Sequence, residues 1–405
     1  MSYNSPLGIY VFWHKDFRQN EDEKIAFGGH EYARFIYSGF CRDIDNPLSR
    51  GVGIPVYYRS ELLAENTFQE IPFHESERNA VIILAESNMA NDSTYRAFIQ
   101  ELISRRDPNT RVLFFTLDKH GSKVSPDQDE RLFTTLHNLE GRTDQDTFTK
   151  RSDKLHSSLL PELTRLLFDE RPSFLSSTED YEKHRPPGQL FISYARKDGE
   201  KQATELHDYI VGKTKIDTFL DVRSIQLEEQ IGSRIKDALN RNTALIVIQT
   251  DEYANREWCR EEVITAKTKG VPVIVVNALK QGEKRSFPYL GNAPTIPWDG
   301  NCQRILDMAM VQILQRRFAN MSNDLEMESY EFLRNFHCTS LGHSPELFDF
   351  VTIRRNQHTK KPALAIYPDP PIGLVEIGLL REIEPGIQFI TPASLPMFNN
   401  QIDRR

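Results

Sequence analysis

The stretch YANREWCREEVITA, residues 253–266, places an aromatic side chain and a carboxylate one helical turn apart. Trp258 and Glu262 are four residues apart, so on a helix both would project from the same side. A carboxylate fixed beside a stacking surface can stabilise a positive charge that develops against it, and an indole face also attracts cations. Two structural alternatives stay open: Glu262 as a solvated glutamate favoured by the helix dipole, and Trp258 as an ordinary packing residue. Between them, Cys259 is expected to be a buried thiol rather than a nucleophile.

Composition restricts the classes of protein to which the chain can belong. Its 405 residues suffice for two or three domains, 39% are hydrophobic, and the net charge is -8. No apolar run is long enough for a bilayer and the N-terminus lacks a basic start followed by an apolar core, so we expect a soluble cytoplasmic protein. The acidic balance does not indicate nucleic-acid binding. No disulfide framework or metal site is predicted from the scattered cysteines and histidines, among them Cys41, Cys302, Cys338, His14, His30 and His74.

The elements around Glu262 alternate between strand and helix over residues 188–298. Apolar runs predict strands at 189–198, 215–221, 243–251 and 271–279, and helices at 199–213, 230–242 and 256–270. This alternation is typical of a parallel sheet covered by helices, in which ligands bind at the carboxyl ends of the strands. The candidate substrate-binding residues at those ends are Tyr194, Arg196, Asp198, Phe219 and Asp221. For Arg196 a diphosphate contact and a plain surface charge stay open, and Asp221 could instead brace its loop.

A similar unit precedes this one. Strands are predicted at 7–16, 51–60, 79–88 and 110–118, with helices at 28–44 and 93–106. At an offset of 164, residues 79–100 align without gaps on 243–264, with Thr94 on Trp258 and Phe98 on Glu262. Both opening strands also end in Lys-Asp, and Lys15 and Asp16 are expected to keep a structural role. Any two α/β units share some pattern, but we predict a degenerate duplication whose first copy lacks the Trp–Glu pair.

The predicted fold class is therefore α/β, with two flavodoxin-like parallel-sheet units in tandem and a small α/β segment at the C-terminus. We divide the chain into residues 1–168, a linker at 169–187 rich in Pro, Ser and charge, a second unit at 188–320, and a segment at 321–405. A helix is expected at 302–318. Residues 361–396 read as strand, Pro-rich turn, helix and strand.

Four motifs in the second unit resemble those of a TIR (Toll/interleukin-1 receptor) domain, in the same order. They are FISYARKD, FLDVRSI, ALIVIQTDEYANREWCREEV, and VPVIVV followed by IPW, which together span about 110 residues. The third contains the family's Trp-Cys-x-x-Glu signature. The second motif resembles the second strand of the family and the start of the loop after it, called the BB loop. One departure is Glu228, which stands where a glycine is expected in that loop and puts the expected loop conformation in question. By this resemblance the first unit is a degenerate TIR-like domain, with a role in sensing or assembly.

The resemblance extends to bacterial anti-phage TIR effectors, which cleave NAD+ at the nicotinamide–ribose bond. It implies that Glu262 is catalytic, that NAD+ is a substrate and no cofactor is needed, and that self-association completes the site in response to an unknown trigger or partner. No phosphate-cradling glycine motif is present. Two alternatives stay open: a non-enzymatic TIR scaffold, and a sensor that binds a nucleotide in its first unit.

Overall fold

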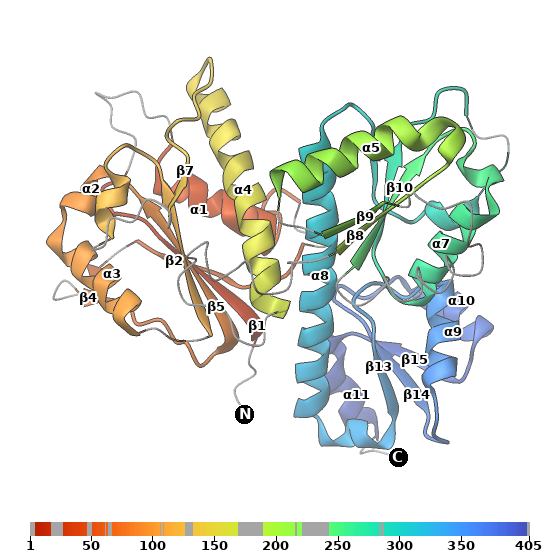
Figure 1. Ribbon diagram of the computed structural model, residues 1–405. Coiled ribbons are helices and arrows are strands. Elements are labelled where there is room, and N and C mark those ends of the chain that lie inside the picture. The colour runs from red at the N-terminus through yellow and green to blue at the C-terminus, as the bar shows by residue number, and fades with distance from the viewer. Residues whose placement is uncertain are drawn as a thin grey trace. The chain divides into compact units, whose positions relative to one another are not determined.

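The computed structural model describes residues 5–17, 27–46, 51–60, 62–63, 67–105, 107, 109–125, 133–168, 189–214, 217–220, 243–282, 285 and 287–402. The chain divides into two compact units, Met1–Arg185 and Pro186–Arg405 (Figure 1). None of the described helices is long and apolar enough to cross a membrane. The expected linker at 169–187 lies outside the described residues, as does the helix expected at 230–242.

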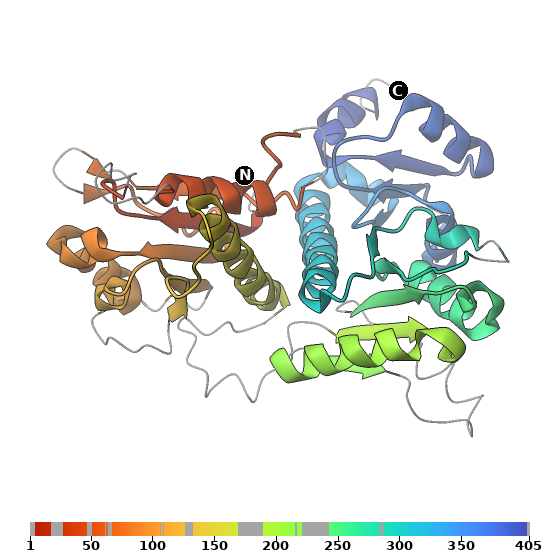
Figure 2. The ribbon, with the colours of Figure 1, turned by 90° about the horizontal axis from the view of Figure 1, so that it is seen from above.

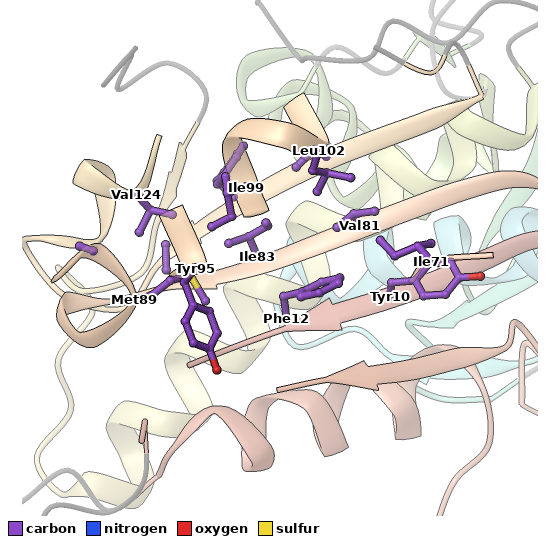
Figure 3. Close-up of a cluster of buried hydrophobic side chains, with 14 residues drawn as sticks. Tyr10, Phe12, Ile71, Val81, Ile83, Met89, Tyr95, Ile99, Leu102 and Val124 are labelled. Carbon is purple, nitrogen blue, oxygen red and sulfur yellow. The ribbon is translucent and has the colours of Figure 1, made fainter. Parts of the chain in front are cut away.

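The first unit is built on a five-stranded parallel sheet in the order β2-β1-β5-β6-β7. Its central strands contain the apolar runs AVIILA and VLFF, which are buried on both faces, as a sheet covered on two sides requires. Helices α1 and α4 lie side by side (Figure 2), while α2 and α3 pack on an apolar core that includes Phe12, Ile83 and Ile99 (Figure 3). The elements are β1 (Ser5–Phe12), α1 (Gly29–Phe40), β2 (Val56–Arg59), the hairpin β3 (Leu62–Leu63) and β4 (Thr67–Phe68), β5 (Ser76–Ala85), α2 (Ser87–Asn91), α3 (Ser93–Arg105), β6 (Thr110–Thr116), β7 (Phe133–Thr135) and α4 (Asp144–Phe168).

The second unit contains a parallel sheet in the order β12-β11-β10-β8-β9. If the strands of each sheet are numbered 1 to 5 along the chain, their spatial order in both sheets is 2-1-3-4-5. This is the flavodoxin-like arrangement, so the predicted fold class is confirmed. The order reverses between β8 and β10, and ligands bind outside the carboxyl ends of strands at such a switch point. The elements are β8 (Gln189–Tyr194), α5 (Arg196–Lys213), β9 (Asp217–Leu220), β10 (Thr243–Gln249), the 3-10 turn η5 (Tyr253–Asn255), α7 (Glu257–Thr268), β11 (Val273–Asn277) and β12 (Thr295–Pro297).

A 28-residue helix, α8 (Cys302–Ser329), leads from this sheet to a three-stranded parallel sheet. The strand, turn, helix and strand expected at 361–396 are confirmed, whereas the strand and helix before them were not predicted. The expected boundary after residue 320 falls inside α8. The elements are β13 (His337–Ser340), α9 (Leu347–Asn356), β14 (Ala363–Ile366), α10 (Leu374–Ile383), β15 (Ile387–Ile390) and α11 (Leu395–Ile402).

The C-terminal segment is docked on the last turn of α7. The Lys267 ammonium lies 2.8 Å from the Glu346 carboxylate and 2.6 Å from the Asn292 amide oxygen, and only 6% of the Lys267 side chain is exposed. One residue later, the Thr268 carbonyl accepts a hydrogen bond of 2.6 Å from Thr352 in α9. The ring of Phe348 lies beneath the same ammonium. These contacts tie α7, which also contains Trp258 and Glu262, to the C-terminal sheet.

Candidate active site at the carboxyl end of β8

Helix α7 places Glu262 on its buried face. The buried positions Cys259, Glu262, Val263 and Ala266 follow the i, i+3, i+4, i+7 spacing of a helix side that packs on a sheet. Their neighbours in the apolar core include residues of β8, β10 and β11. Glu262 is 8% exposed, so its interpretation as a solvated glutamate is wrong. Trp258, one turn earlier, is 45% exposed, so it is not an ordinary packing residue either.

Two hydroxyl groups hold the Glu262 carboxylate in place. Ser193, the penultimate residue of β8, donates a short hydrogen bond from its Oγ to Glu262 Oε2. The Tyr253 hydroxyl lies 2.7 Å from Ser193 Oγ and 3.3 Å from the Cys259 carbonyl oxygen. With Ser193 donating to the carboxylate, Tyr253 is the donor to Ser193. Because a buried polar group is costly unless it is hydrogen-bonded, the Ser193 hydroxyl stabilises the Glu262 carboxylate at this position.

The loop after β8 contributes a brace rather than an open carboxylate. Asp198 accepts hydrogen bonds from the Thr250 hydroxyl at 2.7 Å and from the Glu252 backbone amide at 3.0 Å. Both partners follow β10, so Asp198 joins the two strands that flank the switch point. The neighbouring Lys197 reinforces this link through an ion pair of 2.8 Å with Glu252. A substrate-binding role for Asp198 stays a prediction, but both of its carboxylate oxygens already have partners within the protein.

The structure describes the other candidate residues only in part. Tyr194 is half-buried at the end of β8, and its carbonyl oxygen accepts from the Cys259 thiol at 3.5 Å. Arg196 is exposed at the first position of α5. The backbone of Phe219 pairs with Phe191, but its side chain lies outside the described part of the structure, as do all of Asp221 and Glu228. The described site therefore consists of residues from β8, α5, α7 and the segment that follows β10, which includes η5.

Cys259 is a structural thiol. It is 5% exposed, and burial, together with the nearby charge of Glu262, raises its pKa to about 12. A thiol with such a pKa stays protonated at neutral pH and is a poor nucleophile. The expected buried role is confirmed. Among the residues that the structure describes, no group of three or more His, Cys, Asp or Glu side chains is arranged to hold a metal ion.

Sequence reasoning did not identify Ser193 and Tyr253 as partners of Glu262. Ser193 is a small polar residue between the apolar Ile192 and the aromatic Tyr194, in the strand that leads into the candidate loop. A polar residue at an inward-facing position of a buried strand requires a hydrogen-bonding partner. The sequence therefore indicates that Ser193 has a hydrogen-bonding partner, but it does not identify that partner.

Comparison with known proteins identifies the domain that contains this site. A profile described as "TIR domain" matches residues 190–299. Among solved structures, the TIR domains of the activated Roq1 resistosome, which recognises the pathogen effector XopQ, align at 17% identity over 34% of this chain and 84% of theirs, with a TM-score of 0.20. A protein from Clostridium difficile 630 described as a candidate phosphosugar isomerase aligns at 8% identity over 77% of this chain and 83% of its own, with a TM-score of 0.19. Superpositions this weak do not bear on the fold, and no curated protein matches the chain. The profile match and the motifs that contain Ser193, Trp258 and Glu262 coincide, and residues 190–299 are a TIR domain.

Proposed function

We propose that this TIR domain cleaves NAD+ at the nicotinamide–ribose bond, and that Glu262 is the catalytic carboxylate. The observation that supports the proposal is the position of Glu262, held by Ser193 at the carboxyl end of β8 within a Trp-Cys-x-x-Glu sequence. The edge of the sheet at this end, beside the switch point, is where such folds bind ligands. In the biological setting we propose, the protein is a cytoplasmic effector of anti-phage defence.

The reaction needs a negative charge near the ribose and no acid for the leaving group. The bond between C1′ and the pyridinium nitrogen breaks, both electrons go to that nitrogen, and nicotinamide leaves as a neutral molecule. The ribose is left with oxocarbenium character, which a nearby carboxylate stabilises. Water then adds to C1′ and loses a proton, which gives ADP-ribose. Attack by an adenine ring nitrogen of the same molecule would instead give a cyclic product.

Three residues complete the proposed binding mode. The exposed indole of Trp258 provides a face against which the pyridinium cation can stack. Arg196, exposed at the first position of α5, is suited to the diphosphate, and Tyr194 lies two residues earlier, at the end of β8. Phe219 and Asp221 remain candidates on the β9 side.

The low exposure of Glu262 supports control by assembly. At 8% exposed in a single chain, the carboxylate cannot approach a ribose without a rearrangement around it. We propose that self-association of the TIR domain drives this rearrangement and switches the enzyme on. An NAD+-destroying enzyme that was always active would harm its host, so an inactive single chain fits the proposed role.

The test compares two adjacent glutamates of α7. Purified full-length protein, concentrated with a crowding agent and shown by light scattering to be assembled, is incubated with NAD+ and the products are separated by chromatography. Glu262→Gln should abolish NAD+ loss, whereas Glu261→Gln, a change of the same size at an exposed position one residue earlier, should not. Absence of NAD+ loss in assembled parent protein would contradict the proposal. The product peak distinguishes hydrolysis from cyclisation.

The second candidate function is a non-enzymatic TIR scaffold. Trp258 and Ile264 are large apolar residues of α7 that are 45% and 37% exposed, as residues of a protein-contact surface are. A scaffold would assemble in the same light-scattering experiment without consuming NAD+. In that case Glu262→Gln and Glu261→Gln would behave alike.

A further inference from the structure

A pocket of about 410 Å³ opens in the first unit between the hairpin strand β4 and helix α3. Its walls are apolar and largely aromatic, and include Phe68, Phe73, Phe98, Ile71 and Leu102. Polar side chains line the remainder of the pocket. The size and the mixture of apolar walls with a few polar groups are typical of sites for small molecules.

The pocket lies where the first unit lacks the catalytic pair. Two of its lining residues, Thr94 and Phe98, occupy the positions that correspond to Trp258 and Glu262 in α7. Helices α3 and α7 begin at corresponding residues, Ser93 and Glu257, so the alignment holds in the structure. The first unit therefore presents an aromatic wall at the place in the fold where the second unit has a carboxylate.

The strand beneath shows the matching replacement. Phe12 of β1 pairs with Ile83, and Ser193 of β8 pairs with Val247, which is the counterpart of Ile83. Phe12 thus stands where Ser193 stands in the second unit. The rings of Phe12 and Phe98 are 4.9 Å apart, in place of the hydrogen bond between Ser193 and Glu262. A polar contact between strand and helix has become an aromatic one.

The aromatic wall is fixed before any ligand arrives. The ring of Phe68 lies 4.3 Å from that of Phe98 and 4.8 Å from that of Tyr95, which meets it edge-on. Tyr95 in turn donates a hydrogen bond of 2.7 Å to the Ser60 carbonyl. Figure 3 shows Tyr95 and Phe12 in the buried cluster, against which Phe68 and Phe98 pack. A wall held in this way loses little conformational freedom on binding, which favours affinity.

The charged lining residues select against anions. They are Glu70, Glu101 and Arg105, and the Arg105 guanidinium is paired with the Glu101 carboxylate at 2.7 Å. The pocket therefore has one carboxylate more than it has cations, and the carboxylates can accept hydrogen bonds from a ligand. We propose that this pocket binds an uncharged, planar heteroaromatic molecule of one or two rings that carries an N–H donor. Its flat face stacks on the aromatic wall, as nucleobases do on phenylalanine rings.

The experiment uses the full-length protein and three probes of this class: adenine, indole and nicotinamide. Binding is followed by saturation-transfer NMR and titration calorimetry. At least one probe should bind with a Kd below about 1 mM, whereas nicotinate, which differs from nicotinamide by a negative charge, should bind at least tenfold more weakly. If none of the three binds in this range, or if nicotinamide binds and nicotinate binds equally well, the proposal is wrong.

Two variants locate the binding. Ala97→Trp fills the pocket from an exposed position of α3 and should weaken binding at least tenfold, while Gln100→Trp places the same bulk on the same helix at an exposed residue that does not line the pocket. Phe98→Leu keeps the site apolar but removes the ring, and should weaken binding severalfold. Binding that persists in Ala97→Trp would overturn the assignment. Because binding is read without NAD+ turnover, the result is independent of whether the TIR domain is an enzyme.

Discussion

The Ser193 hydroxyl donates a hydrogen bond to the Glu262 carboxylate across 69 residues of sequence and thereby joins β8 to α7. Both residues are buried, with 1% and 8% of their surface exposed. The bond fixes a carboxylate at the end of the sheet where ligands of this fold class bind. It also makes Ser193 a positioning residue for the proposed chemistry.

Removal of the Ser193 hydroxyl should destabilise the TIR domain. Ser193→Ala removes one hydrogen-bond donor from a buried carboxylate, which costs about 1–3 kcal/mol of unfolding free energy. Urea denaturation followed by circular dichroism measures the change. Tyr253→Phe is the companion variant, because it removes the second hydroxyl but leaves the bond between Ser193 and Glu262 intact. A loss in Tyr253→Phe as large as that in Ser193→Ala would argue against a specific role for Ser193.

Replacement of Trp258 should separate function from stability. Since the side chain is 45% exposed, Trp258→Ala should cost less unfolding free energy than the roughly 3–5 kcal/mol expected for a fully buried tryptophan. The same variant should lower NAD+ turnover by assembled protein, because the pyridinium loses its stacking surface. Ile264→Ala is the control: it removes an exposed apolar residue from the same helix and should leave turnover unchanged. Equal turnover in both variants would remove Trp258 from the proposed site.

The cysteines should differ in their reactivity toward iodoacetamide. Burial raises the pKa of Cys259 to about 12, so almost no thiolate is present at pH 8. Half-buried Cys41 should react first in native protein, and buried Cys259 should react only after unfolding. Mass spectrometry of peptides at successive times measures the order, and protein in urea shows that all four thiols can react. Early modification of Cys259 would contradict this assignment.

Acid should weaken the contact between α7 and the C-terminal segment. Burial alone would raise the pKa of Glu346, but hydrogen bonds from His343 and Lys267 outweigh it and lower the pKa to about 2. The stabilisation is therefore complete above about pH 4.5, the ordinary value for this carboxyl, and is lost as the pH falls from there toward about 2. Urea denaturation at a series of pH values should show this loss in the parent protein and much less of it in Glu346→Gln.

A matched ion pair provides the control for that series. Glu331 and Arg334 form a pair of 3.4 Å in which both side chains are at least 80% exposed. Exposed pairs contribute little to stability, so Glu331→Gln should leave both the stability and its pH dependence close to those of the parent. A parallel loss in Glu331→Gln and Glu346→Gln would mean that the buried network is not the source of the acid sensitivity.

Hydrophobic pattern was sufficient to predict the first four strands of each five-stranded sheet, because most of them contain apolar runs. It did not predict β7, a three-residue edge strand that is half-buried or exposed. It was not sufficient for β13, whose residues HCTS are all half-buried and contain no such run. The Lys-Asp endings of the two opening strands were also misleading by one residue. They align Ser193 with Val11, whereas the strand pairings align it with Phe12. A local motif can shift without cost in a loop, while the register of a buried strand cannot.

Within the candidate site, sequence identified the carboxylate but not what holds it. Glu262 could be selected because a signature surrounds it. Ser193 and Tyr253 could not be linked to it, since the Ser193 hydroxyl reaches Glu262, and the Tyr253 hydroxyl reaches Ser193, only after β8 and α7 have packed together. The same limit applies to Lys267 and Glu346. They are 79 residues apart and join α7 of the TIR domain to the C-terminal segment. Contacts of this kind depend on tertiary structure and leave no periodic trace in the chain.

Helix α8 belongs to two hydrophobic cores at once. Its first half packs on the TIR sheet through residues such as Ile305 and Ala309, and near its end the Asn323 amide donates to the carbonyls of Leu341 and Ile366 beside the second sheet. Because the helix cannot melt in one core and persist undisturbed in the other, the two sheets should melt together in one cooperative calorimetric transition. The C-terminal sheet should thus unfold as one thermodynamic unit with the TIR domain, so that heating that unfolds one sheet also unfolds the other.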